Sequence, residues 1–166
     1  MTHPSVDTSD DALHASMATL IRSDFGELIW RDRARLGPIA PVVSPHTGQT
    51  HLHDAVAKRK LSAVKWLVRL GGRVREPRGG PLSCPWVTAL QSPEPLPILR
   101  LLLTSPTLTP DELAQCADDL VLVRDRARSR GDITTAYAIY AEVCQRVGRD
   151  PGPPPETGSY HARTPE

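Results

Sequence analysis

The chain has 166 residues and a mass of 18.2 kDa, enough for one compact domain or for about four helix-pair units of roughly 33 residues, and too few for two large domains. Its net charge is +1, only 4% of its residues are aromatic, and 17 are proline. This composition disfavours a strongly basic nucleic-acid-binding domain and favours a core built from small apolar residues.

The cysteines and the N-terminal sequence bear on the cellular compartment. Cys84, Cys116 and Cys144 are odd in number and fall at positions typical of buried helix faces. We therefore expect reduced core thiols and no disulfide framework. Residues 1–9 have neither a basic start nor an apolar run, and no segment approaches the roughly 20 apolar residues that a membrane span needs. These features predict a cytoplasmic protein.

The N-terminal third predicts a flexible start, residues 1–9, followed by a pair of helices. The apolar residues of the first helix are Leu13, Met17, Leu20 and Ile21, and those of the second are Phe25, Leu28, Ile29 and Leu36. Asp24, with Glu27 three residues later, matches a capping box for the second helix. We interpret this pair as an atypical unit that caps one end of the fold. The prolines within residues 38–45 then predict an extended connection, including a β-competent run over residues 39–43.

Two further helices are predicted within residues 48–75. Thr50 can cap the first of them by accepting a hydrogen bond from a backbone N–H. Its apolar series consists of Leu52, Ala55 and Val56, and that of the second helix consists of Ala63, Val64, Leu67 and Val68. The second helix ends at Gly71, which can take the left-handed conformation that a helix end needs. One such pair cannot bury both of its faces, so a neighbouring pair is required.

A shift of 34 residues maps this pair onto residues 82–103. Thr50 then falls on Cys84. The shift also relates Leu52, Ala55 and Val56 to Trp86, Ala89 and Leu90, and Val64, Leu67 and Val68 to Ile98, Leu101 and Leu102. In the other direction it relates residues 69–71 to residues 35–37, both Arg-Leu-Gly. Repetition near this period is typical of a stacked helical solenoid.

The first of these helices also carries a family signature. Thr50, Leu52, His53 and Ala55 occupy four places of a Thr-Pro-Leu-His-x-Ala pattern, and His51 stands at the place of the proline. In this respect residues 48–75, and residues 82–103 after them, resemble ankyrin repeats. The resemblance implies an all-α, ankyrin-like solenoid with atypical capping helix pairs. It also implies a structural role for His53, whose ring would hydrogen-bond between neighbouring turns, and a projecting finger after Gly71 in the binding face.

The remaining sequence predicts a helical hairpin and a tail. Residues 109–112, Thr-Pro-Asp-Glu, combine a cap, a first-turn proline and a capping-box glutamate. After a turn near Gly131, residues 131–148 form a second helical stripe that weakly resembles a tetratricopeptide hairpin, and we expect this pair to cap the open end. Residues 149–166 are rich in proline, glycine and polar residues and predict a disordered tail, which leaves residues 10–148 as the folded domain.

A histidine cluster is the basis of the main alternative. His46, His51, His53 and Asp54 are dense enough in sequence to suggest the metal site of a metal-dependent enzyme. If Thr50 starts a helix, however, His51 and His53 point about 200° apart, whereas paired helical ligands need a spacing of three or four residues. We therefore expect no metal, no cofactor and no enzymatic activity, and keep the metal-dependent enzyme as the alternative.

Basic residues concentrate in the middle of the chain. Against the single acid Glu76, this belt contains Lys58, Arg59, Lys60, Lys65, Arg69, Arg73, Arg75 and Arg78. Interleaved aromatic residues are lacking, which disfavours a nucleic-acid partner, and solvent-exposed helix backs account for Lys65 and Arg69. The candidate partner contacts are Arg73, Arg75, Glu76 and Arg78 on the finger, with Asp54 and Lys58 on the adjoining helix.

Together these features predict a protein-binding module and not an enzyme. We expect its partner to be another protein with an acidic contact surface. The chain would act by occupying that surface, as an adaptor, an inhibitor or an immunity-type protein does.

Overall fold

The computed structural model describes residues 8–75, 84–127 and 130–156, and the structural statements below refer to these ranges. Within them the chain forms nine α-helices and one short 3-10 helix, and its only β-type pairing is an isolated bridge between Val43 and Thr50. The prediction of an all-α fold is therefore confirmed. Among the described residues, no helix is both long enough and apolar enough to cross a membrane.

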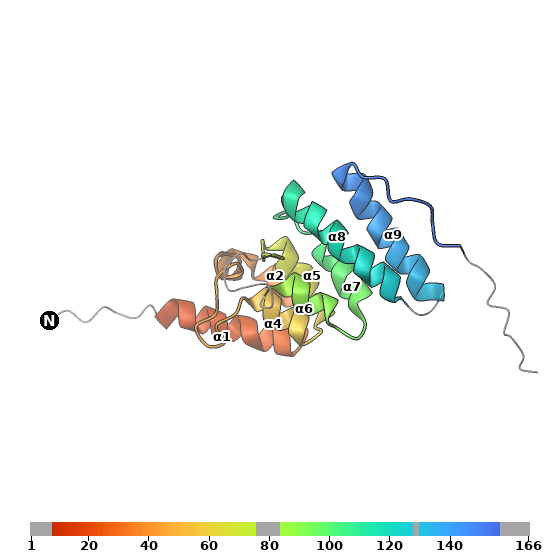
Figure 1. The fold of residues 1–166 in the computed structure, drawn as a ribbon. Helices are drawn as coiled ribbons and strands as arrows, with labels where there is room; N and C mark the ends of the chain where they lie inside the picture. Colours follow the sequence, from red (N-terminus) through yellow and green to blue (C-terminus); the bar gives the residue numbers. More distant parts are fainter. Residues whose placement is uncertain (1–7, 76–83, 128–129, 157–166) are drawn as a thin grey trace, which may run out of the picture. The chain divides into compact units, whose positions relative to one another are not determined.

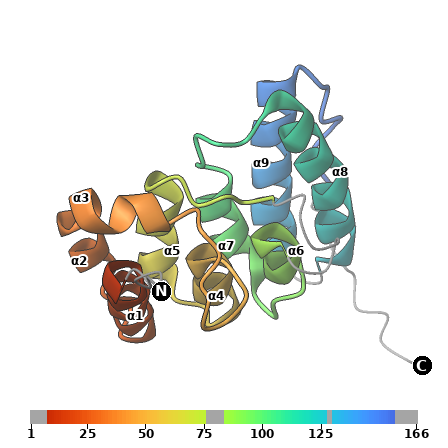
Figure 2. The same cartoon turned by 90° about the vertical axis from the view of Figure 1, so that its left-hand side faces the viewer.

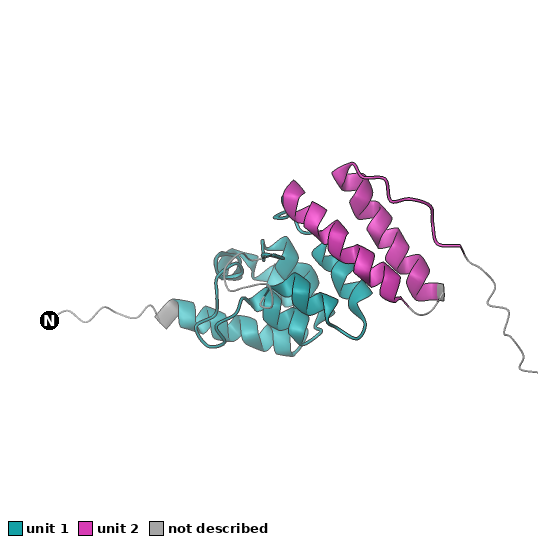
Figure 3. Cartoon of the chain, in the orientation of Figure 1, with its two compact units in different colours: residues 1–109 teal, residues 110–166 magenta. Residues whose placement is uncertain are grey.

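The chain divides into two compact units, residues 1–109 and residues 110–166 (Figure 3). Unit 1 contains α1 (Thr8–Arg22), α2 (Gly26–Arg31), α3 (Arg33–Leu36), the 3-10 helix η1 (Gly37–Ile39), α4 (His51–Ala57), α5 (Leu61–Arg69), α6 (Pro85–Leu90) and α7 (Pro95–Leu102). Unit 2 contains α8 (Pro110–Arg126) and α9 (Arg130–Val147). Of the predicted flexible N-terminus, residues 8 and 9 already belong to α1 and residues 1–7 lie outside the described residues.

The main helices of unit 1 form two rows, which can be followed in Figures 1 and 2. In the first row α4 packs against α1 on one side and against α6 on the other. In the second row α5 packs against α2 on one side and against α7 on the other. Contacts between α4 and α5, and between α6 and α7, join the two rows. Each sequence-adjacent pair therefore contributes one helix to each row.

The N-termini of α4 and α6 have matching caps. The Thr50 hydroxyl accepts a hydrogen bond from the backbone N–H of His53 at 3.3 Å, and the Cys84 thiol accepts one from Val87 at 3.5 Å. Both capping residues have extended backbones, with ψ of 156° and 149°. The predicted cap at Thr50 is confirmed, and Cys84 repeats its geometry 34 residues later.

The second row buries one face of α5 and one of α7. In α5 the buried residues are Ala63, Val64, Leu67 and Val68, as the apolar pattern predicts. In α7 they are Ile98, Leu99 and Leu102, whereas Leu101, which the 34-residue shift aligns with Leu67, is only half-buried. Because α7 is apolar on several sides, its sequence pattern does not determine which side faces the core.

The start of α2 differs from the prediction. Its N-cap is Phe25, and Asp24 stands before it in a left-handed conformation with φ of 55°. The Asp24 carboxylate does not cap α2; it accepts a hydrogen bond from the backbone N–H of Ala63, in the first turn of α5. The expected capping box with Glu27 is therefore wrong, because tertiary packing takes the aspartate to another helix.

The connection between α3 and α4 is more compact than predicted. Ile39 ends η1 and is buried, so the first part of the predicted β-competent run is helical. The chain then forms a narrow loop in which the Ser44 N–H donates to the Gln49 carbonyl oxygen at 2.8 Å. Gly48 turns this loop with φ of 69°, a conformation that favours glycine. The loop ends at Thr50, the N-cap residue of α4.

Unit 2 is a helical hairpin in which α8 and α9 lie side by side (Figure 1). Its buried residues are Leu113, Cys116, Ala117, Leu120, Ala136, Ile139, Tyr140, Val143 and Cys144. All three cysteines of the chain are buried and free, as predicted.

Gly148, with φ of 70°, ends α9, and the segment after it contacts the hairpin. The Tyr137 hydroxyl donates to the Gly152 carbonyl oxygen at 2.7 Å, and the Arg149 guanidinium pairs with Asp118 at 2.6 Å. Residues 149–156, the start of the predicted disordered tail, thus make specific contacts. Residues 157–166 lie outside the described residues.

Candidate protein-binding surfaces

Two of the predicted contact residues lie at α4, in the first row: Asp54 within the helix and Lys58 as its C-cap. Asp54 and Lys58 form an i,i+4 ion pair with an N to O distance of 3.2 Å. The lysine side chain is 46% exposed and the aspartate side chain only 17% exposed, so the cation faces solvent more than the anion does. The structure brings these two predicted residues together, but much of their charge is mutually compensated.

The base of the predicted finger follows α5. Arg73 is exposed, whereas Val74 is 1% exposed and its carbonyl oxygen accepts a hydrogen bond from the backbone N–H of Trp86 at 3.1 Å. Arg75 is half-buried and has an interaction partner of its own. The other two predicted contacts, Glu76 and Arg78, lie outside the described residues. Among the described residues of the finger, Arg73 is thus the arginine that is exposed to solvent.

The histidines near the start of α4 reach different neighbours. A ring nitrogen of His51 lies 2.7 Å from one of His14 on α1, and the two rings stack with centroids 5.0 Å apart. The His53 Nε2 lies 2.8 Å from the Thr88 hydroxyl on α6. His46 is exposed in the preceding loop. His51 and His53 therefore diverge, as the helical geometry predicts, and each contacts an adjacent helix of the first row.

Burial sets the protonation of these rings. It lowers the pKa of His51 to about 4, with a smaller contribution from His14, and the carboxylate of Asp54 opposes the shift only in part. Burial also lowers the pKa of His53. Both rings are therefore neutral near pH 7, and one nitrogen of each can accept a hydrogen bond while the other donates. Within the described ranges, no group of three or more His, Cys, Asp or Glu side chains is arranged to hold a metal ion.

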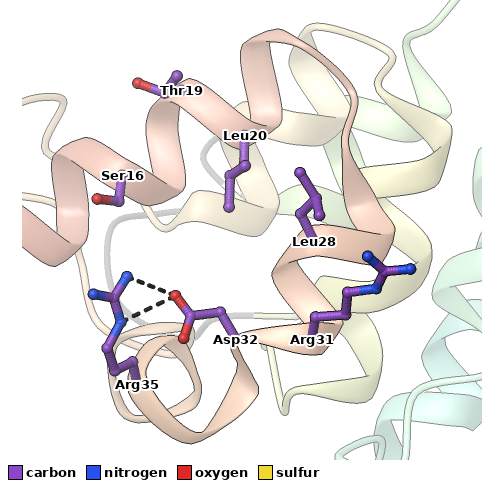
Figure 4. A pocket seen from close by; sticks show the side chains of 7 residues that line it. All are labelled: Ser16, Thr19, Leu20, Leu28, Arg31, Asp32 and Arg35. Atoms are coloured by element: carbon purple, nitrogen blue, oxygen red, sulfur yellow. Dashed lines mark hydrogen bonds and ion pairs between the residues drawn. The ribbon is translucent and has the colours of Figure 1, made fainter.

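A surface pocket of about 530 Å³ lies between α1 and the segment α2–α3 (Figure 4). It is lined by Ser16, Thr19, Leu20, Leu28, Arg31, Asp32 and Arg35. Asp32 and Arg35 pair with each other at 2.6 Å, and Leu28 is 41% exposed. The pocket thus combines apolar side chains with an ion pair whose charges compensate each other.

The sequence analysis missed an aromatic cluster on the second row. The indole rings of Trp30, on α2, and Trp66, on α5, stack with centroids 5.1 Å apart and an interplanar angle of 27°. The Arg33 guanidinium lies 4.8 Å from the centre of the Trp30 ring. Lys65 and Arg69 lie 5.0 Å and 4.6 Å from the centre of the Trp66 ring.

One local signal of this cluster was present in the sequence. Trp66 stands between Lys65 and Arg69 at spacings of one and three residues, which places an aromatic ring among the basic residues of α5. Trp30 carries the same kind of signal, with Arg33 three residues later, but it lies 36 residues before Trp66 and outside the 34-residue register. The partner of Trp66 could be found only from the packing of α2 on α5.

Comparisons with models of protein families, with curated proteins and with solved structures find no match to the chain. The resemblance to ankyrin repeats therefore depends on the residues of this chain alone.

Proposed function

We propose that unit 1 is an ankyrin-like repeat stack that acts as a protein-binding module and not as an enzyme. The observation that supports this best is the repetition between the pairs α4–α5 and α6–α7. Their caps, Thr50 and Cys84, share one geometry, and the ring of His53 bonds to Thr88 across the two first-row helices. This bond is of the kind that the ankyrin resemblance implies for this histidine. The first pair, α1 and α2, would be the atypical end of the stack.

Binding follows from the rigidity of such a stack. Each pair is held by its neighbours, so the backbone that carries the exposed side chains of the first-row helices has a fixed position before a partner arrives. Little entropy is then lost in ordering this surface when a partner binds. We propose that Arg73, with Lys58 at the end of α4, contributes to a surface for acidic groups of another protein, which the module would occupy as an adaptor, inhibitor or immunity-type protein.

The alternative, a metal-dependent enzyme, has no specific observation in its favour. Two of its proposed ligands, His51 and His53, already make hydrogen bonds to His14 and Thr88 in the packing of the first row. Metal analysis of the purified full chain tests this alternative directly. Stoichiometric metal with a hydrolytic or oxidative activity would contradict the proposed function.

The binding proposal is tested by comparing two charge reversals. Proteins captured from a native lysate on immobilised full chain are identified, and the affinity of the most enriched one is then measured for purified wild type, Arg73→Glu and Arg31→Glu. Arg31 belongs to the pocket between α1 and α2, at the other end of unit 1 in sequence, and serves as the matched control. We expect a loss of about tenfold or more for Arg73→Glu and little change for Arg31→Glu. The reverse result would move the site to the pocket, and the absence of any saturable partner would contradict the proposed function.

A further inference from the structure

The second row carries a compact group of five side chains, which we call the tryptophan–cation patch: Trp30, Arg33, Lys65, Trp66 and Arg69. Both indoles are half-buried and the three basic side chains are exposed. Because the indoles stack on each other, each has one face against the other ring. Arg33 lies over the Trp30 ring, and Lys65 and Arg69 lie over the Trp66 ring. The patch therefore presents three exposed cations held against two half-buried rings.

The guanidinium groups of Arg33 and Arg69 lie 4.8 Å and 4.6 Å from the centres of the indole rings. A guanidinium whose plane rests on an aromatic ring keeps its N–H donors at its edge, where they can form paired hydrogen bonds to a carboxylate. One N–H group of the Arg33 guanidinium donates to the Trp30 carbonyl oxygen at 3.1 Å, and a guanidinium has further N–H donors for a ligand. The rings limit the freedom of the long side chains, so less entropy is lost when an anion binds.

Among the described residues, the three cations of the patch have no carboxylate partner. Three other cations of unit 1 have carboxylate partners, in the pairs Arg35–Asp32, Lys58–Asp54 and Arg59–Glu94. For Arg33, Lys65 and Arg69, no carboxylate of the described residues lies within ion-pairing distance. Three adjacent cations without counter-charges are complementary to an acidic ligand.

The patch rests on a rigid junction. Asp24, just before α2, accepts a hydrogen bond from Ala63 of α5. A Cβ atom on Gly26 would lie 2.2 Å from the Ser62 carbonyl oxygen, so the two helix starts are in direct backbone contact. The helices that carry Trp30 and Trp66 are thus held close at their N-terminal ends in the free protein.

We propose that the tryptophan–cation patch binds an acidic polypeptide segment of a partner protein through the carboxylates of Asp and Glu side chains. The proposal rests on the proposed protein-binding function and adds a second-row surface to it. A single-stranded nucleic acid fits less well, because such ligands gain affinity by stacking bases on exposed aromatic faces. Here the two indoles are half-buried, they stack on each other, and the three cations lie over them.

The probe is a fluorescein-labelled oligo-glutamate peptide, titrated with the full chain at low salt while anisotropy is followed. We expect the double variant Arg33→Glu/Arg69→Glu to weaken binding by at least about tenfold. The control is Arg22→Glu, a charge reversal at an exposed position at the end of α1, with an expected change of less than about twofold. Tryptophan fluorescence should change on binding, and the change reports the patch because the third tryptophan, Trp86, is fully buried.

A conservative variant distinguishes a shaped site from a general attraction of charges. Arg69→Lys keeps the charge but loses the planar group that stacks and forms paired hydrogen bonds. We expect it to weaken peptide binding by about threefold or more, while far-ultraviolet circular dichroism and the melting temperature stay close to those of the wild type.

Several results would overturn this proposal. Equal losses in the double variant and in Arg22→Glu would show a general charge effect, and tighter binding of oligothymidylate than of oligo-glutamate would assign the patch to nucleic acid. If Arg73→Glu no longer binds a captured partner while Arg33→Glu/Arg69→Glu still binds it, the proposed function stands and the patch proposal fails. If no partner is captured, the proposed function fails, while the peptide titration still decides whether the patch selects carboxylates.

Discussion

The carboxylate of Asp24 accepts a hydrogen bond from the backbone N–H of Ala63 across 3.1 Å, although the two residues are 39 positions apart in the chain. Ala63 is the third residue of α5, whose own N-cap, Lys60, makes no side-chain capping bond. An aspartate from the preceding helix pair therefore satisfies a backbone donor that the local sequence leaves open. This contact joins the first pair of unit 1 to the second.

Replacing Asp24 should destabilise unit 1. Asp24→Ala removes the cap of α5 and places alanine at a left-handed φ, so we expect a loss of about 1–2 kcal/mol in the free energy of unfolding, measured by urea denaturation. Asp24→Asn should lose less, because asparagine tolerates this φ and keeps an acceptor oxygen. Glu27→Ala is the control: it would be costly if a capping box existed and should be nearly neutral here. A large effect of Glu27→Ala would restore the local capping model.

Gly26 should be intolerant of a side chain. In Gly26→Ala the new Cβ atom would lie 2.2 Å from the Ser62 carbonyl oxygen, and backbone atoms cannot move away cheaply. We expect a destabilisation of about 3 kcal/mol or more, or failure to fold. Gly37→Ala is the matched control, because nothing lies within 4 Å of its Cβ position and its φ is −54°. If both variants melt at the same temperature, the close packing of α2 on α5 is wrong.

Stability should fall on acidification through the titration of His51. Its pKa is about 4 in the folded chain, below the ordinary value of 6.5, because the ring is buried beside His14. Between these two values the unfolded chain binds more protons, so the folded state is fully favoured above pH 6.5 and loses this contribution as the pH falls towards 4. The loss is at most about 1.4 kcal/mol per pH unit.

Thermal melts across this pH range measure the effect. His51→Gln should flatten the dependence, whereas His46→Gln, at an exposed position, should leave it as in the wild type. The difference between the variants is the relevant quantity, since carboxylates also titrate near pH 4. Parallel curves for wild type and His51→Gln would show that the His14–His51 contact does not determine the acid sensitivity.

Truncation of leucines should follow the observed face of α7. Leu67→Ala and Leu99→Ala remove fully buried side chains and should each cost about 2–5 kcal/mol in urea denaturation. Leu101→Ala should cost clearly less, because Leu101 is only half-buried. The 34-residue shift makes the opposite prediction for positions 99 and 101. A larger loss at Leu101 than at Leu99 would favour the strict repeat over the described packing.

The sequence alone was sufficient for features that depend on neighbouring residues. The cap at Thr50 and the buried face of α5 were both predicted, because a helix cap joins groups three residues apart and a helical stripe repeats within one turn. The divergence of His51 and His53 was predicted for the same reason, since the angle between two positions on a helix depends only on their separation.

Only the tertiary structure decided the contacts between helices. Nothing within α2 indicates that Trp30 meets Trp66, or that Asp24 serves α5 and not its own helix. Such pairs depend on how two helix surfaces approach, which is the joint result of many weak apolar contacts and of permissive positions such as Gly26. The tertiary structure also decided that Leu99 is buried and Leu101 only half-buried. An apolar helix can turn more than one face to the core, and the surrounding packing selects one.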